Sequence, residues 1–266
     1  TPAEERAEIL EAISALIFDK QDELVDAEVA DNGSTLRKAG TADIPHSAET
    51  FEYFAELARA PACEEFSYDM PVESLNLVIR EPFGVTAAIV PWNFPLAGAS
   101  WKVAPALAAG NTMILKPSPF TPVTAIMLAE IAKEAGLPDG VLNVVTAPEN
   151  TLGAGLVEHP KVRKICFTGS TKVGQDVMRS AAGTLKSVTL ELGGKSPNIM
   201  LEDADFDIAV RGALFGTFFH GGQVCTSGTR VLVPRSRYDE FVERMVADAA
   251  KIVVGDPTDP DTTMGP

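Results

Sequence analysis

Basic residues and cysteines are both scarce in this sequence of 266 residues. It holds 22 lysines and arginines against 37 aspartates and glutamates, a formal net charge of −15 at pH 7. Because an acidic surface repels phosphate backbones, we expect no nucleic acid as a partner. The three cysteines, Cys63, Cys166 and Cys225, are too widely spaced for a disulfide framework or a metal-ligand cluster. We therefore expect no bound metal and a reducing, cytoplasmic location.

Long apolar runs are also absent. Every hydrophobic stretch stops well short of the roughly 20 residues that a membrane-spanning helix requires. The polar, acidic start at residues 1–5 differs from a secretory signal peptide. The sequence therefore predicts a soluble protein with no membrane partner. The three histidines, His46, His159 and His220, are scattered, and we expect surface or loop positions rather than ligands or bases.

Hydrophobic periodicity predicts the elements of the first part of the chain. Apolar residues at helical spacing indicate one helix through 9–17, a second through 24–29 that ends at Asn32-Gly33, and a third at 46–59. Between 74 and 80, apolar and polar residues alternate, which is typical of a strand with one polar face. We expect an exposed arm strand within about 66–82 that pairs with another subunit.

Short apolar strands then alternate with helices. The predicted strands are 85–90, 112–115, 141–145, 162–167 and 187–191, and the predicted helices are 96–110, 121–136, 151–158 and 170–182. This alternation predicts an α/β fold with a Rossmann-like parallel sheet and helices on both faces. Ligands of such sheets bind beyond the carboxyl ends of the strands. A second α/β unit is predicted from residue 194, with strands at 197–201 and 230–234 and helices at 206–219 and 238–253.

Two residues far apart in the sequence have settings suited to covalent chemistry. Cys225 follows Gly221-Gly222-Gln223 and precedes Thr226-Ser227, whereas a lone cysteine such as Cys166 is usually a small buried hydrophobe. A thiolate at Cys225 can attack a carbonyl carbon. Glu191 ends a predicted strand before Gly193-Gly194, where a carboxylate can activate water; a salt bridge or a helix cap is its structural alternative.

A third segment offers an amide. Asn93 lies between Trp92 and Phe94, with prolines at 91 and 95 that restrict the backbone. A rigidly held amide N–H can stabilise an oxyanion, an interaction worth on the order of 3 kcal/mol. Taken alone, Asn93 is more often a cap of the following helix.

Two further segments suit a nucleotide. Residues 167–174, Phe-Thr-Gly-Ser-Thr-Lys-Val-Gly, form a strand-to-helix turn whose helix N-terminus suits a phosphate, although glycine there can also serve packing alone. The G-x-G-x-x-G fingerprint of dinucleotide-binding sites does not occur in this turn. Lys116, before Pro117-Ser118, can reach a ribose or phosphate from a strand end, or remain a solvated charge.

Together these segments resemble the aldehyde dehydrogenase superfamily. The motifs are PWNFP at 91–95, LKPS at 115–118, FTGSTKVG at 167–174, ELGGKSPNIM at 191–200 and GGQVCTSGTR at 221–230, in the order found in the family. The resemblance covers essentially the whole chain. It implies oxidation of an aldehyde to a carboxylic acid with NAD or NADP, through a hemithioacetal and a thioester on Cys225. It also implies a homo-oligomer, a dimer or a tetramer.

The resemblance assigns roles to single residues. Cys225 would be the nucleophile, Asn93 and the backbone N–H of Cys225 the oxyanion hole, Glu191 the base for hydrolysis, and Lys102 a lysine near the catalytic centre. The implied cofactor-binding residues are Lys116, Ser118, Phe167, Gly169, Ser170, Pro91, Trp92 and Leu192. The implied substrate tunnel is lined by Phe94, Trp101 and Val224. Residues 1–193 would hold the N-terminal helices and the dinucleotide-binding domain, and 194–266 the start of an incomplete catalytic domain.

The sequence departs from the family pattern at three places. Pro119 stands where the family usually has a glutamate that binds the ribose hydroxyls, so we expect NADP to be accepted beside NAD. Residues 146–150 replace glycines near the adenine site. The family continues well beyond residue 266, so we expect a fragment of a longer protein. The remaining alternatives are a non-catalytic nucleotide-binding protein and a CoA-acylating relative; the latter commonly lacks the glutamate that is present at 191.

Overall fold

A parallel sheet forms the centre of the molecule. The computed structural model describes residues 1–60, 63–66, 74–148 and 151–266. Its five-stranded sheet has the order β5-β4-β3-β6-β7, with every pair parallel. The strands are β3 (Val85–Ile89), β4 (Thr112–Lys116), β5 (Leu142–Val144), β6 (Lys164–Gly169) and β7 (Ser187–Leu192). The predicted parallel sheet is confirmed. From β3 the chain first builds outward through β4 and β5, then returns to place β6 and β7 on the other side of β3.

Helices cover both faces of this sheet, as predicted. They are α5 (Pro95–Ala108), α6 (Val123–Glu134), α7 (Thr151–Glu158) and α8 (Thr171–Ala182). Neighbouring side chains of a strand point to opposite faces, so Ala88 joins the core beneath α5 and α6 while Ala87 joins the core beneath α7 and α8. Of the segment 146–150 noted above, residues 149–150 lie outside the described residues.

The N-terminal helices pack beside α5 and α6. They are α1 (Ala3–Asp19), α2 (Gln21–Asn32), α3 (Leu36–Lys38), the π-helix η1 (Ala39–Asp43) and α4 (Ile44–Ala58). As predicted, α2 ends at Gly33, which has a left-handed φ of 73°. The helix predicted at 46–59 is α4, which begins two residues earlier than predicted and follows α3 and η1 directly. Pro45 lies in the first turn of α4, directly after the π-helix η1.

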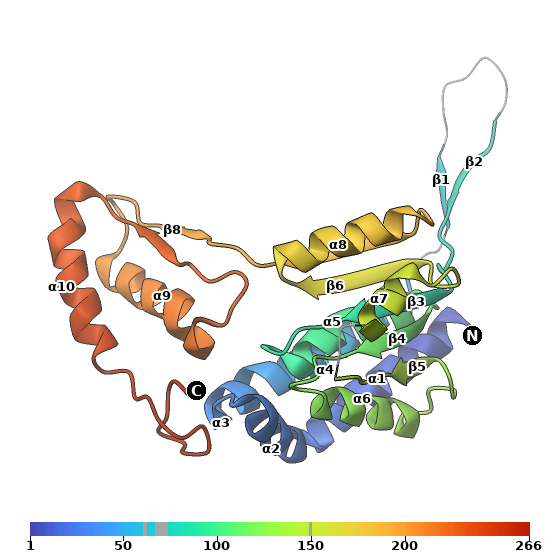
Figure 1. The fold of residues 1–266 in the computed structure, drawn as a ribbon, viewed down its shortest axis with the longest axis horizontal. Coiled ribbons are helices and arrows are strands. Elements are labelled where there is room, and N and C mark those ends of the chain that lie inside the picture. Colours follow the sequence, from blue (N-terminus) through green and yellow to red (C-terminus); the bar gives the residue numbers. More distant parts are fainter. Residues whose placement is uncertain (61–62, 67–73, 149–150) are drawn as a thin grey trace.

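The predicted arm strand is a two-stranded hairpin rather than one strand over 66–82. Its strands, β1 (Cys63–Phe66) and β2 (Asn76–Ile79), pair antiparallel and project from the molecule (Figure 1). The part of the prediction at 67–73 lies outside the described residues. Leu77 and Val78, which point to opposite faces of β2, are both exposed, so apolar side chains lie on both faces.

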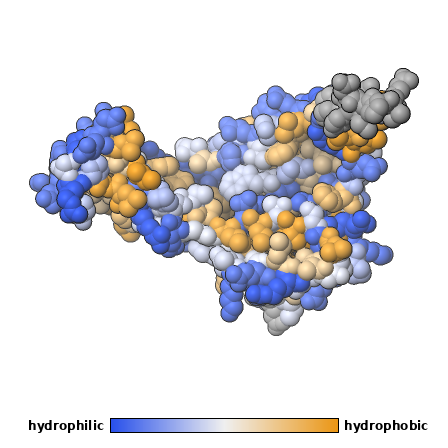
Figure 2. Space-filling model, turned by 90° about the horizontal axis from the view of Figure 1, so that it is seen from above, coloured by the Kyte–Doolittle hydropathy of each residue, from blue (hydrophilic) through white to orange (hydrophobic). Residues whose placement is uncertain are grey.

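The C-terminal elements extend away from the central sheet beyond a segment that follows β7 (Figure 1). They are β8 (Pro197–Ile199), α9 (Phe206–Phe218), the 3-10 helix η2 (Phe219–Gly222), β9 (Arg230–Leu232), the 3-10 helix η3 (Arg235–Arg237) and α10 (Tyr238–Ala249). β8 and β9 form a parallel pair. Apolar side chains such as Phe215 and Val246 stay exposed on these elements, and Figure 2 shows apolar surface over this part. None of the described helices is long and apolar enough to cross a bilayer.

Candidate active site

A cavity of about 290 Å³ opens at the carboxyl ends of three sheet strands. Its walls are residues 91–94 after β3, 168–170 at the end of β6, 191–193 at the end of β7, Gly98 and Trp101 on α5, and Gln223 and Cys225. The strand order reverses between β3 and β6, and ligands of doubly wound sheets bind at such a switch point. The fold therefore places the cavity where a ligand site is expected.

Most of the predicted site residues meet at this cavity. The residues in its wall are Cys225, Glu191, Asn93, Pro91, Trp92, Phe94, Trp101, Gly169, Ser170 and Leu192. The predicted residues that do not line it are Lys102, Lys116, Ser118, Phe167 and Val224. Lys116 is buried, and its Nζ donates to the carbonyl of Pro117 at 3.1 Å. It is therefore not the solvated charge that the sequence left open, and burial lowers the pKa of its amine.

Cys225 lies exposed on a turn that its neighbours fix. The buried Ser227 donates its hydroxyl to the carbonyl of Gly216 at 2.8 Å, and the Gly228 N–H donates to the same oxygen at 3.0 Å. The loop after Glu191 passes close by, because a Cβ on Gly194 would come within 3.4 Å of the Cys225 carbonyl. The two residues thus share one cavity although the sequence separates them widely.

The amide of Asn93 connects the β3–α5 segment to this turn. Its Nδ2 donates to the carbonyl of Gln223 at 2.8 Å, two residues before Cys225. It does not cap α5, whose N-cap is Phe94 without a side-chain hydrogen bond. Asn32, at the end of α2, donates to the carbonyls of Trp92 and Asn93 at 3.3 and 3.4 Å. Gln223 therefore holds the side-chain amide of Asn93 and Asn32 holds its backbone, and these contacts use only one of the two amide N–H groups.

The turn from β6 into α8 needs its glycines for packing. A Cβ on Gly169 would come within 2.5 Å of the Phe167 ring, and one on Gly174 within 2.7 Å of Leu192. Ser170 is the N-cap of α8 and accepts from the Val173 N–H at 3.3 Å. Both glycines therefore lie close to neighbouring side chains, as the packing alternative predicts. The exposed helix N-terminus at the cavity wall also remains suited to an anion.

Aromatic rings form the remaining wall. The Phe94 ring lies 6.2 Å from Trp101 and 5.3 Å from His220, and the Lys38 Nζ lies 4.4 Å from the Phe94 centroid. The Trp101 indole donates to Nε2 of His46 at 3.0 Å. The sequence offered no periodic or motif signal for His46, His220 or Lys38, since their contacts form only between elements distant in the chain.

The comparisons with known proteins agree with this geometry. A sequence profile of the Aldehyde dehydrogenase family matches residues 1–266. The chain belongs to the aldehyde dehydrogenase family. It is 46% identical over 263 residues to a betaine aldehyde dehydrogenase of Vibrio vulnificus (strain YJ016). The matched region covers 99% of this chain and 54% of that protein. The family predicted from the motifs is confirmed.

Solved structures of the aldehyde dehydrogenase family confirm the fold. A betaine aldehyde dehydrogenase from Staphylococcus aureus in complex with NAD+ matches with a TM-score of 0.95 at 39% identity, covering 100% of this chain and 52% of that chain. An aldehyde dehydrogenase from Brucella melitensis biovar abortus 2308 matches with a TM-score of 0.96 at 41% identity, covering 100% and 55%. The chain spans about half the length of the relatives it matches.

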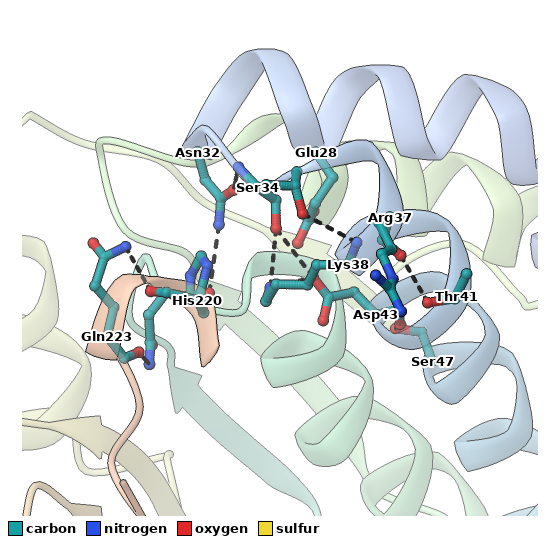
Figure 3. Close-up of polar contacts among 12 residues, drawn as sticks. Glu28, Asn32, Ser34, Arg37, Lys38, Thr41, Asp43, Ser47, His220 and Gln223 are labelled. Atoms are coloured by element: carbon teal, nitrogen blue, oxygen red, sulfur yellow. Dashed lines mark hydrogen bonds and ion pairs between the residues drawn. The ribbon is translucent and has the colours of Figure 1, made fainter. Parts of the chain in front are cut away.

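A buried polar cluster in this aldehyde dehydrogenase chain lies beside the segment that carries Asn93 (Figure 3). Lys38 is paired with Asp43 and donates to Ser34 at 2.9 Å, and all three residues are buried. Glu28 is 0% exposed and accepts from the Thr124 hydroxyl at 2.9 Å. Burial, and next the charge of Asp43, raise the pKa of Glu28 to about 7, against the lowering effects of Thr124, Lys38 and the Leu96 N–H.

We expect Glu28→Gln to remove a pH dependence of stability. The pKa of Glu28 is about 7 in the fold and near 4.5 unfolded. The folded state therefore binds the proton more tightly. Protonation of Glu28 therefore contributes up to about 3 kcal/mol to the free energy of unfolding. This contribution is fully present below pH 4.5 and is lost as the pH rises through 7. Glutamine mimics the protonated carboxyl.

Urea unfolding at pH 5 and pH 8 measures this effect. The wild type should lose stability relative to Glu28→Gln between the two values. Glu8→Gln, at an exposed position on α1, is the control and should follow the wild type. An unchanged pH dependence in Glu28→Gln would contradict the expectation.

Proposed function

We propose that the protein oxidises an aldehyde to a carboxylic acid with NAD or NADP as the electron acceptor. The observation that carries this proposal is the convergence of Cys225, Glu191 and Asn93 on one cavity at the switch point of the sheet. Membership of the aldehyde dehydrogenase family supports it, as does the NAD+ in the Staphylococcus aureus relative. The wall residues also fit a dinucleotide, because the N-terminus of α8 at Ser170 provides free N–H groups for a pyrophosphate.

The protein residues would perform the following chemistry. The thiolate of Cys225 attacks the carbonyl carbon, and the oxygen takes the negative charge of a hemithioacetal. The free N–H of the Asn93 amide and the backbone N–H of Cys225 stabilise that charge. A bound nicotinamide would supply the acceptor for the hydride that leaves the hemithioacetal carbon, so that Cys225 would then carry a thioester.

Glu191 would complete the cycle. Its carboxylate takes a proton from a water molecule, and the water oxygen attacks the thioester carbon. The C–S bond then breaks, the carboxylic acid leaves, and the thiolate of Cys225 is regenerated. Glu191, near the end of β7, and Cys225, in the turn after η2, line the same cavity, which supports a role for each in the reaction.

The test combines turnover with binding. Formation of reduced nicotinamide is measured with betaine aldehyde, the compound for which the relatives are named, and with short aliphatic and aromatic aldehydes. NAD binding is measured by calorimetry on the same protein. Turnover supports the proposal. Binding without turnover supports the non-catalytic alternative, and acyl-CoA formation in the presence of CoA supports a CoA-acylating enzyme.

We expect the catalytic efficiencies with NADP and NAD to lie within about tenfold of each other. Pro119 is exposed in the turn after β4, so no carboxylate at this position repels a 2′-phosphate. Pro119→Glu should lower kcat/KM for NADP by about tenfold or more, because like charges would be brought close together. Pro119→Gln is the control, because glutamine has nearly the same size as glutamate but no charge. This variant should still use NADP. A wild type that rejects NADP by several orders of magnitude contradicts this expectation.

We also propose that the β1–β2 hairpin joins subunits of a dimer or tetramer. The exposed apolar residues Leu75, Leu77 and Ile79 support this, because a projecting apolar hairpin is a favourable surface for pairing. We further propose that the dinucleotide-binding domain ends near residue 193, since the central sheet ends at Leu192. Sedimentation velocity tests the assembly: Leu77→Lys should yield smaller species than the wild type, and an unchanged distribution would contradict it.

A further inference from the structure

His220 has a backbone conformation that side chains rarely adopt. Its φ is +52°, and Gly221 and Gly222 follow with φ of +62° and +78°. Within the described parts of the chain, Leu185 is the one other non-glycine residue with positive φ. Leu185 is 92% exposed in the turn after α8, whereas His220 is partly buried and precedes Cys225. A strained residue persists where its surroundings hold it in place, so the contacts of His220 are informative.

The backbone of His220 connects to Asn93 through Gln223. The carbonyl of His220 accepts from the N–H of Gln223 at 3.1 Å and from its Nε2 at 3.0 Å. The carbonyl of Gln223 in turn accepts from Asn93 Nδ2 at 2.8 Å. The left-handed conformation of His220 directs its own carbonyl toward Gln223. The position of the Asn93 amide therefore depends on this turn.

The side chain of His220 contacts the same segment from another side. Its ring packs against Phe94 with centroids 5.3 Å apart. Figure 3 shows His220 and Gln223 on one turn close to Asn32, which donates to the carbonyls of Trp92 and Asn93. His220 itself is absent from the cavity wall. Its effect on the site is therefore indirect.

We propose that His220 is a positioning residue that holds residues 220–223 in the left-handed turn placing the Asn93 amide beside Cys225. Histidine adopts the left-handed region more readily than most side chains, and the hydrogen bonds of Gln223 transmit the position of the turn to Asn93. This inference rests on the proposed aldehyde oxidation, because a misplaced Asn93 amide no longer stabilises the oxyanion of the hemithioacetal. The loss should therefore appear in kcat rather than in cofactor binding.

Two substitutions at His220 and one control separate the turn from other effects. Alanine adopts the left-handed region less readily than histidine, so in His220→Ala kcat should fall about tenfold or more while KM for the cofactor stays within about twofold. His220→Asn should restore kcat to within about threefold of the wild type, because asparagine adopts the left-handed region readily. Leu185→Ala, at the other strained position, should leave kcat within about twofold.

Amide hydrogen exchange, which needs no substrate, tests whether His220 holds the turn and the Asn93 segment in place. The amides of residues 92–94 and 223–225 should exchange faster in His220→Ala than in the wild type or His220→Asn. The proposal is overturned if His220→Ala keeps the kcat and the amide protection of the wild type. It is also overturned if His220→Ala and His220→Asn lose kcat to the same extent. If the wild type oxidises no aldehyde, the proposed function fails, and the exchange data still decide the role of His220.

A further variant tests the proposal if His220→Ala does not fold. Gln223→Met has a similar volume and lacks the Nε2 donor to the His220 carbonyl. We expect it to lower kcat about fivefold while His220→Asn retains activity. An unchanged kcat in Gln223→Met overturns the proposal.

Discussion

Cys225→Ala should abolish aldehyde oxidation in the full-length protein, with a loss of at least about a thousandfold in kcat. Alanine removes the sulfur that forms both covalent intermediates, and the methyl group has no electron pair with which to replace it. Cys225 lies exposed on a turn held by Ser227 and Gly228, so the substitution leaves no cavity in a core. Folding and cofactor binding should therefore survive.

Cys166→Ala is the matched control for Cys225→Ala. Cys166 lies in β6, where its neighbours are sheet residues, and it does not line the cavity. We expect this variant to retain kcat within about threefold of the wild type. Formation of reduced nicotinamide and calorimetric binding of NAD are measured for all three proteins. Substantial oxidation by Cys225→Ala would exclude Cys225 as the nucleophile.

Glu191→Gln should separate the two halves of the reaction. Oxidation needs the Cys225 thiolate, whereas hydrolysis of the thioester needs a base for water. Glutamine keeps the shape of the side chain but accepts no proton, so steady-state turnover should fall about 10²- to 10⁴-fold. The first turnover should remain fast, and rapid mixing should show a burst of reduced nicotinamide equal to the number of active sites.

Mass spectrometry supplies the second measurement for Glu191→Gln. The stalled thioester should be found on the peptide that contains Cys225. Glu158→Gln, at an exposed position at the end of α7, is the control and should turn over as the wild type does. Loss of the burst together with the steady state would show that Glu191 acts before the hydride leaves, which contradicts the assigned role.

The predictability of the fold differed between its parts. The alternating apolar strands and helices of 85–192 predicted the parallel sheet correctly, because buried strands and amphipathic helices have different hydrophobic periods. The helix predicted at 46–59 was correct to within two residues, but the π-helix at 39–43 before it was not predicted, because its period differs from that of an α-helix. The arm was predicted as one strand because the antiparallel pairing of 76–79 with 63–66 joins segments that are separated in the sequence.

The motifs and their order were enough to identify the family by resemblance, and the hydrophobic periods were enough to predict the sheet, because both are properties of short segments of the chain. The prediction of scattered surface or loop histidines was incomplete: His220 does lie in a turn, but its ring is partly buried against Phe94. Burial and the nearby Lys38 charge lower the pKa of His220 to about 4. The motif residues that share the cavity, the contacts that hold Asn93 and the side chains behind it were visible only in the folded chain. Those contacts join α2, the β3–α5 segment and the turn after α9, which come together only when the chain has folded.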